Sequence, residues 1–235
     1  MAKLREHKII LRGKRVVLRP LTEDDWGILL KWNSDPQVLY FTEGEEVSSY
    51  TLDQIQSIYR WVSQTAFCFM IEFKETPIGE CWLQQMNLER ILQKYPKADS
   101  RRIDLMIGVK ELWGQGLGTE VIQTLSAFAF DEQHANLVFG CDVADYNPAS
   151  FKAFHKAGYT EDAQIEQPPG KKARYCYDLV LTREKYTALE ELRCGLSSGC
   201  AIAYSSNCIP SQWPYFRRFK PQYNMIFRDS RIFQI

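Results

Sequence analysis

Apolar residues recur along the chain with two different periods. In some segments the apolar side chains are three or four residues apart, which is the spacing of one helix face. This pattern predicts helices at 26–32, 52–62, 119–129 and 147–158, and Pro36 is suited to start a further short helix. Other apolar segments are short and rich in β-branched and aromatic residues, which is typical of strands. They predict strands at 15–22, 67–74, 76–86, 101–109, 136–143 and 174–182.

The order of these elements is that of an α/β fold. Strands and helices follow one another as β-α-α-β-β-β-α-β-α-β, and the pattern leaves open one more strand near 159–164. Such an order predicts a mixed sheet flanked by helices. The charged segment 87–100 is expected to be a surface excursion. Residues 190–235 show neither period, so we expect a folded domain over 1–189 and a poorly ordered C-terminal extension over 190–235.

Composition and charge exclude several classes of function. Hydrophobic residues make up 45% of the 235 residues, which is enough for a full core. The 29 basic residues equal the 29 acidic ones, which argues against broad binding to nucleic acid or to a membrane surface. No secretory h-region, long apolar run or C-x-x-C pair of cysteines is present in the sequence. We therefore expect a cytoplasmic protein with reduced thiols and no metal site.

Three glycines precede the helix predicted at 119–129. The stretch "WGQGLGT" places Gly114, Gly116 and Gly118 at alternate positions directly after a predicted strand. The first amides of a helix lack internal partners and lie at its positive end, and glycine lets the backbone approach a bulky anion. The pattern therefore indicates a diphosphate cradle, and an ordinary tight turn is the alternative. The dinucleotide pattern G-x-G-x-x-G and the P-loop pattern are both absent.

These residues resemble motif A of the GCN5-related N-acetyltransferases (GNAT). Gly116 and Gly118 match the glycines of that motif, and Trp113 stands where Arg or Gln is usual. Downstream, "DYNPASFKAFHKAGY" resembles the family segment that begins at Asn147. The resemblance covers about residues 14–186 and implies a GNAT fold, with a mixed, mostly antiparallel sheet flanked by helices, and acetyl-coenzyme A (acetyl-CoA) as donor. The cofactor-binding residues it implies are Ile107, Val109, Gln115, Gly116, Leu117, Gly118, Thr119 and Asn147.

A narrower resemblance is to the aminoglycoside 6'-N-acetyltransferases. It implies that Asp104, in "RRIDLMIG", lies beside the amine that is acetylated and is the catalytic residue. It also implies that Asp142 contacts the sugar amines. The remaining substrate-binding residues would come from a wall near the amino terminus, namely Trp32, Tyr40, Phe41, Glu43, Glu45 and Glu46. Such a set agrees with the physical requirement that a polycation be met by several carboxylates.

Several points stay open at the level of sequence. Asp104 either serves the reaction or simply pairs with Arg101 or Arg102, or faces solvent. A backbone amide near 107–109 is expected to meet the oxyanion. The family position of the acid that protonates the leaving thiolate holds Phe154, so Tyr146, Tyr159 or no protein acid takes that role.

Other acceptors are compatible with the same cradle. Three alternatives to an aminoglycoside acetyltransferase remain: a protein N-terminal or ribosomal-protein acetyltransferase, an N-acetyltransferase of siderophore intermediates, and a non-catalytic acyl-CoA sensor. The acidic loop 43–46 favours a cationic acceptor, but many peptides are cationic as well.

Overall fold

A single sheet organises the chain. The computed structural model describes residues 3–43 and 47–195, and its strands pair in the order β1-β2-β3-β4-β5-β6-β8-β7. All neighbouring strands are antiparallel except β5 and β6, which are parallel. The predicted α/β class with a mixed, mostly antiparallel sheet is thereby confirmed. The strands are β1 Leu11–Arg12, β2 Val16–Pro20, β3 Ala66–Phe73, β4 Thr76–Gln85, β5 Ser100–Ile107, β6 Leu137–Ala144, β7 Thr160–Glu166 and β8 Tyr175–Thr182.

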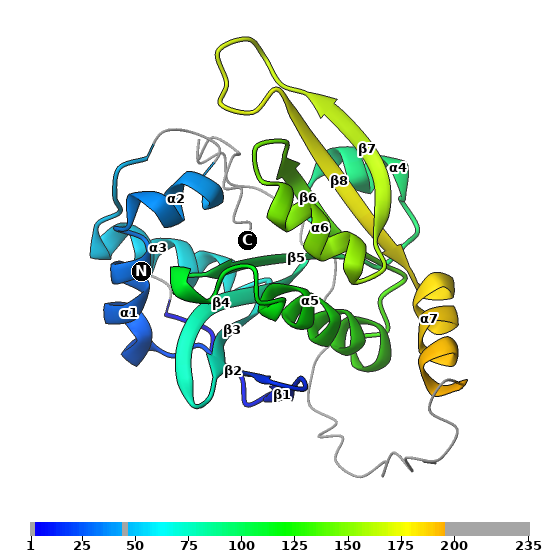
Figure 1. Cartoon of the computed structure of the whole chain (residues 1–235), viewed down its shortest axis with the longest axis horizontal. Coiled ribbons are helices and arrows are strands. Elements are labelled where there is room, and N and C mark those ends of the chain that lie inside the picture. The colour runs from blue at the N-terminus through cyan, green and yellow to red at the C-terminus, as the bar shows by residue number, and fades with distance from the viewer. Residues whose placement is uncertain (1–2, 44–46, 196–235) are drawn as a thin grey trace.

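Helices cover the sheet in two groups, which Figure 1 shows with α1–α3 together at one side of the molecule and α5 and α6 near its middle. The strand left open near 159–164 is present as β7, and the excursion at 87–100 contains the short helix α4. The helices are α1 Trp26–Trp32, α2 Pro36–Thr42, α3 Leu52–Val62, α4 Glu89–Lys94, α5 Leu117–Ala127, α6 Pro148–Lys156 and α7 Arg183–Gly195. No helix among the described residues is both long and apolar enough to cross a bilayer.

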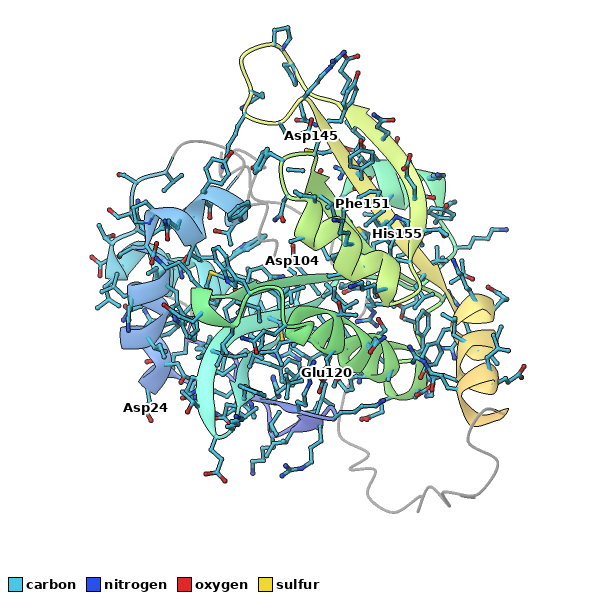
Figure 2. All side chains as sticks on the ribbon, viewed as in Figure 1. Asp24, Asp104, Glu120, Asp145, Phe151 and His155 are labelled. Atoms are coloured by element: carbon cyan, nitrogen blue, oxygen red, sulfur yellow. The ribbon has the colours of Figure 1, made fainter. Side chains whose placement is uncertain are left out.

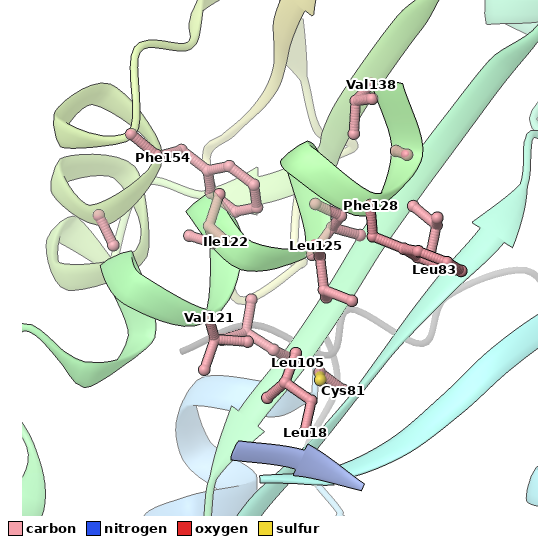
Figure 3. Close-up of a cluster of buried hydrophobic side chains, with 14 of the residues drawn as sticks. Leu18, Cys81, Leu83, Leu105, Val121, Ile122, Leu125, Phe128, Val138 and Phe154 are labelled. Carbon is pink, nitrogen blue, oxygen red and sulfur yellow. The ribbon is translucent and has the colours of Figure 1, made fainter. Parts of the chain in front are cut away.

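The pleat of the central strands separates an apolar face from a mixed one. Successive side chains of a strand point to opposite faces. On one face Leu105 and its neighbours meet the apolar stripe of α5, where Figure 3 shows Val121, Ile122 and Leu125. On the other face, Trp82 of β4 and Met106 of β5 pack in a cluster with residues of α1–α3. The three buried charged residues of these strands, Glu80, Arg102 and Asp104, lie on this second face.

The strands β5 and β6 pair over only part of their length. Residues 100–102 pair with 137–139, and no pairing between the two strands continues beyond Arg102. The pairing of β6 with β8 is interrupted by a bulge between Gly140 and Val143, and Asp142 within it has φ +57°. The C-terminal half of β5 therefore separates from β6, and Asp104 lies in this separated half.

The helix α7 crosses the boundary expected between 189 and 190. It continues to Gly195, and Leu189 packs on the core beneath it. The Tyr186 ring stacks on Phe130 at 4.7 Å between centroids. The first residues of the predicted extension thus continue a helix that is docked on the domain, whereas residues 196–235 lie outside the described part of the chain. The domain limits at 1–189 and 190–235 stay a prediction, with the helix end at Gly195 as the better limit.

Candidate active site

The glycine turn joins β5 to α5 and is open. Gly116 adopts the left-handed conformation, with φ +78°, and the first internal bond of the helix runs from the Glu120 amide to the Gly116 carbonyl at 3.2 Å. The amides of Leu117, Gly118 and Thr119 precede that bond, so they point out of the helix end. A Cβ added at Gly114 would meet nothing within 4 Å. Unpaired amides, the positive helix end and open space above the turn together fit a diphosphate group.

An ion pair from the first strands braces this turn. The Glu120 carboxylate accepts from the Val16 amide at 3.0 Å and from Arg15 Nε at 2.9 Å, and Arg15 Nη1 donates to the Gln115 carbonyl at 3.2 Å (Figure 2 labels Glu120 on α5). Although burial acts to raise it, the pKa of Glu120 is held below its ordinary value by these hydrogen bonds and by the charge of Arg15. The sequence analysis assigned no role to Glu120, because its partners come from a distant segment of the chain.

The residues beside the turn have structural partners. The Leu117 side chain is buried in the core, and the Gln115 side chain donates to the Glu111 carbonyl at 2.9 Å. Trp113, the residue that departs from the family pattern, donates its indole N–H to the Ile107 carbonyl at 2.7 Å. Its ring thus closes the turn that follows β5.

The expected oxyanion donors at 107–109 are already engaged. The Gly108 amide donates to the Ile78 carbonyl at 2.8 Å, and the Val109 amide donates to the same oxygen at 3.2 Å. The neighbouring strand β4 takes both donors in this structure, and the role of an amide of this segment at the oxyanion stays a prediction. Sequence spacing placed them at a strand end but could not show which carbonyl they face.

Asp104 is a buried and anchored carboxylate. Its residue is 2% exposed, and Arg102 holds both oxygens, with Nη2 to Oδ1 at 2.6 Å and Nε to Oδ2 at 2.8 Å. The Trp82 indole also donates to Oδ2, at 2.9 Å. Of the open alternatives, pairing with Arg102 is confirmed and exposure to solvent is wrong, while Arg101 pairs with Asp99 instead. Figure 2 shows Asp104 near the centre of the molecule, between α2 and α6.

A second buried carboxyl, Glu80, lies two residues from Trp82 on the same face of β4. It is 0% exposed, and neither of its oxygens has a hydrogen-bond partner of normal geometry among the described residues. Burial raises the pKa of Glu80 well above its ordinary value, and the negative charge of Asp104 raises it further. The sequence reasoning missed this residue, although an acid inside the apolar run "PIGECWL" is the same signal that indicated Asp104.

Asp142 also carries an arginine partner. Arg90 Nη2 donates to Asp142 Oδ1 at 2.7 Å, and the same guanidinium makes bonds of 2.8 and 2.9 Å to Asp178. Burial raises the pKa of Asp142, and the charges of Arg90 and Arg102 oppose that effect. Arg90 comes from α4, inside the segment that the sequence indicated only as a surface excursion. The carboxylates of this region are therefore balanced by arginines that the sequence reasoning did not include.

The helix α2 links the two sides of the separated strands. Asn147, which is fully buried, donates from Nδ2 to the Phe41 carbonyl at 3.3 Å and accepts from the Ser150 amide at 3.2 Å, which caps α6. Phe41 packs edge-on against Trp113 at 5.6 Å between ring centroids. Asn147 thus holds protein groups at both ends of its amide in this structure, and its contact with the cofactor stays a prediction.

Only some of the residues expected to form the acceptor-binding wall lie at the surface. Trp32 is 3% exposed, because its ring packs directly against Gly108, where an added Cβ would lie 2.2 Å from the ring. Tyr40 is 51% exposed, whereas Glu43 is buried. Glu45 and Glu46 lie outside the described residues. Of the described residues of this wall, Tyr40 is therefore the most exposed, and Phe41 is half-buried.

Comparison with family models identifies the family of this chain. The acetyltransferase (GNAT) domain model matches residues 15–160. The chain belongs to this GNAT acetyltransferase family. The predicted family resemblance is thereby confirmed, and this GNAT chain is an acetyltransferase by family.

The relatives of this GNAT chain differ in their acceptors. It is 22% identical over 160 residues to an aminoglycoside N(6')-acetyltransferase type 1 of Klebsiella pneumoniae, an alignment that covers 66% of this chain and 79% of the relative. Its fold matches that of AAC(6')-Ib in complex with ribostamycin and coenzyme A, with a TM-score of 0.63 and 22% identity over 74% of this chain and 97% of the other. It also matches a spermidine N-acetyltransferase of Vibrio cholerae, in complex with coenzyme A and spermine, with a TM-score of 0.60 and 18% identity over 74% and 99% of the two chains. At these identities the solved structures establish the fold of the GNAT chain and leave its acceptor to the site.

The two tyrosines left open as leaving-group acids differ in burial, and the phenylalanine at the family position of the acid is buried with one of them. Phe154 is 1% exposed and packs edge-on against Tyr159 at 5.0 Å, so it is part of the core. Tyr159 is equally buried, and its hydroxyl shares a hydrogen bond with Ser126 at 2.7 Å. Tyr146 is half-buried and donates to the Glu43 carbonyl at 3.0 Å. Tyr159 is therefore closed off from a substrate, and Tyr146 is the tyrosine of this group that lies at the rim of the GNAT site.

Proposed function

We propose that this protein acetylates a primary amine of a small cationic acceptor, and that the 6'-amine of an aminoglycoside is the first acceptor to test. As a GNAT acetyltransferase, it takes the acetyl group from acetyl-CoA. The observation that carries the proposal is the anchored Asp104 carboxylate in the separated half of β5, three residues before the strand leads into the glycine turn. The similarity to aminoglycoside acetyltransferases supports the choice of acceptor.

The residues of the glycine turn would hold the donor by its diphosphate. The amides of Leu117, Gly118 and Thr119 supply hydrogen-bond donors, and the Arg15–Glu120 pair keeps the turn in shape. When bound, the donor supplies an activated acetyl thioester. The separated edges of β5 and β6 give an extended ligand room between the strands, because backbone groups there are not paired with each other.

Asp104 acts on the acceptor in this proposal. Most primary amines are protonated at neutral pH, so the attacking nitrogen must be held and must lose its proton. Arg102 and Trp82 fix the carboxylate in one orientation and together occupy both lone pairs of Oδ2, so Oδ1, which accepts from Arg102 alone, keeps a lone pair for an incoming ammonium. A fixed carboxylate positions the nitrogen and accepts its proton directly or through water, and much of the rate gain comes from holding both substrates in line.

The second candidate acceptor is a smaller amine. It is favoured by the balance of positive and negative side chains at the site. Arg90 and Arg102 pair with Asp104, Asp142 and Asp178, so this cluster keeps an excess of one negative charge. A site for a large polycation gains from several uncompensated carboxylates. An acceptor with few amino groups, such as a polyamine of short length, fits the described part of the site at least as well as an aminoglycoside.

A panel of amines tests the proposal. Release of the coenzyme A thiol is measured with kanamycin, tobramycin, ribostamycin, spermidine and a peptide with an unblocked amino terminus. Turnover of one or more aminoglycosides supports the first candidate, and turnover of spermidine alone supports the second. Turnover of the peptide alone would replace both by a protein acetyltransferase, and coenzyme A binding without turnover of any amine would replace them by a sensor.

A further inference from the structure

The loop between β7 and β8 reaches across to α2. Figure 1 shows this loop standing out from the sheet on the side where α2 lies. From it Lys172 extends to residues far away in the sequence, and its ammonium donates to the Tyr40 carbonyl and, at 3.3 Å, to the Glu43 carbonyl. These contacts join the loop to the part of the molecule where Tyr40 is exposed.

Two aromatic rings also lie beside this ammonium. Lys172 Nζ lies 3.8 Å from the centroid of the Tyr40 ring and 4.3 Å from that of Tyr146. The two rings are 5.6 Å apart with an interplanar angle of 57°. The Tyr146 hydroxyl donates to the Glu43 carbonyl, which fixes the ring, and burial raises the pKa of Tyr146, so its hydroxyl stays neutral. We call the Tyr40 and Tyr146 rings together with the Tyr40 and Glu43 carbonyls the ammonium cage.

This combination of groups selects a primary ammonium. A cation over the face of a tyrosine within about 6 Å is attracted by the ring quadrupole. Carbonyl oxygens add acceptors for the N–H groups, and they distinguish a primary ammonium from a quaternary one, which has no N–H to donate. A neutral hydrogen-bond donor gains from the carbonyls alone, and an anionic ligand gains from neither feature.

We propose that the ammonium cage is a binding subsite for a second amino group of the acceptor, and that Lys172 occupies it until that amino group displaces it. The proposal rests on the function proposed above, because it concerns an acceptor with at least two amino groups. Helix α2 carries Tyr40 and also contacts Asn147 and Trp113 at the two edges of the separated strands, so the cage and the site of acetyl transfer share one wall. One amine held at the cage would thus present another amine of the same molecule toward Asp104.

Competition by Lys172 has a measurable consequence. When a ligand must displace a tethered group, its apparent affinity equals its affinity for the empty site multiplied by the fraction of time that the site is empty. Lys172→Ala is therefore expected to lower KM for a diamine or aminoglycoside by about tenfold, which corresponds to about 1.4 kcal/mol, with kcat unchanged. The KM for a matched monoamine and the KM for acetyl-CoA are expected to stay the same. Lys171→Ala, which removes an equal charge from the same loop, is the control.

The rings are tested in the Lys172→Ala background, where no lysine competes. There, Tyr146→Leu is expected to raise KM for the diamine by roughly tenfold through loss of a cation–π partner, and Tyr146→Phe, which keeps the ring, is expected to change it little. The proposal is overturned if Lys172→Ala leaves the diamine KM unchanged, or if mono- and diamine respond alike. Either result would mean that Lys172 only anchors the loop.

A spectroscopic readout separates this proposal from the proposed function. Reductive methylation with ¹³C-formaldehyde labels lysines for NMR and keeps their charge. The ring currents of Tyr40 and Tyr146 should shift the methyl signal of Lys172 upfield. That signal is assigned by its absence from the spectrum of Lys172→Arg. Methylammonium chloride is expected to return the signal to the position of an exposed lysine, whereas sodium chloride at equal ionic strength is not. If methylammonium displaces Lys172 from the cage but no amine of the panel is turned over, the ammonium cage is supported and the acetylation of these acceptors is refuted. Absence of displacement would refute the cage whatever the enzyme acetylates.

Discussion

Replacing Asp104 by Asn is expected to destabilise the protein as well as to slow the reaction. Arg102 is 7% exposed, and Asp104 holds its guanidinium through both carboxylate oxygens. The substitution leaves this guanidinium buried without its close counter-charge, and only the charge of Asp142 still favours it from farther away. Loss of activity in the single variant therefore has two physical sources that must be separated.

The magnitude follows from the burial of the pair. Removing one partner of a buried ion pair costs about 3–5 kcal/mol, because the other charge is left uncompensated. For a chain of this size each kcal/mol lowers Tm by about 2–4 °C, so a decrease of about 6–20 °C is expected. Asp99→Asn breaks the neighbouring pair with Arg101, in which Asp99 has a side chain 41% exposed, and is expected to cost about 0–1 kcal/mol.

A double-mutant cycle measures the coupling. Urea and thermal unfolding are compared for the wild type, Arg102→Met, Asp104→Asn and the combined variant, with Asp99→Asn as the exposed control. Removing both charges avoids the uncompensated guanidinium, so the combined variant is expected to be more stable than Asp104→Asn alone. Its kcat/KM is expected to stay low, because the carboxylate that positions the amine is still missing.

Two results would refute this reasoning. If Asp104→Asn unfolds at the wild-type temperature, Arg102 does not depend on the carboxylate for its burial. If the combined variant regains wild-type kcat/KM together with stability, Asp104 serves the fold and takes no part in acetyl transfer.

Three further predictions follow from single features of the structure. The pKa of Glu80 is raised in the folded state, so the folded protein keeps a proton that the unfolded chain releases above about pH 4.3. Stability should therefore fall as pH rises from about 4.3 through the folded pKa, and Glu80→Gln should flatten this decline in Tm. Parallel curves of Tm against pH for the wild type and Glu80→Gln would contradict this prediction. Gly116→Val places a β-branched residue at φ +78° and should weaken coenzyme A binding at least tenfold, as measured by calorimetry. The control Gly27→Val, whose added Cβ meets nothing within 4 Å, should bind coenzyme A as the wild type does. Equal affinities of Gly116→Val and the wild type would count against the diphosphate cradle. Deleting residues 196–235 should leave Tm and activity unchanged. Deleting residues 184–235 also removes the stacking of Tyr186 on Phe130 and should lower Tm. A lower Tm after deletion of 196–235 alone would mean that this segment belongs to the domain.

Much of the fold was predictable because it depends on local periodicity. The apolar spacing of Val121, Ile122 and Leu125 defined a helix face that the structure buries against β5. The glycine turn was predictable for a similar reason, since backbone conformation and amide exposure at a helix start are set by neighbouring residues. Neither α4 nor α7 was predicted as a helix, because short or charged helices carry little apolar periodicity of their own.

The chemistry of the site was only half predictable. The sequence marked Asp104 as an acid in an apolar strand, but it also left open which arginine, if any, would pair with it. It gave no sign that Arg90 would reach Asp142 from another segment, or that the amides at 108 and 109 would donate to Ile78. These partners depend on strand register and on how loops cross, and neither is written in the spacing of nearby residues.

By itself, the sequence determined most of the segments that become helices and strands, the position of the open glycine turn, and the family to which the chain belongs. Only the tertiary structure decided which charges neutralise one another and where a second ammonium can bind. Arg15 and Glu120 are 105 residues apart and Lys172 and Tyr40 are 132 apart, yet each pair is in contact. The reason is physical: periodicity reports the face that a segment buries, whereas ion pairs and aromatic contacts form between whichever side chains the packed sheet and its loops bring together.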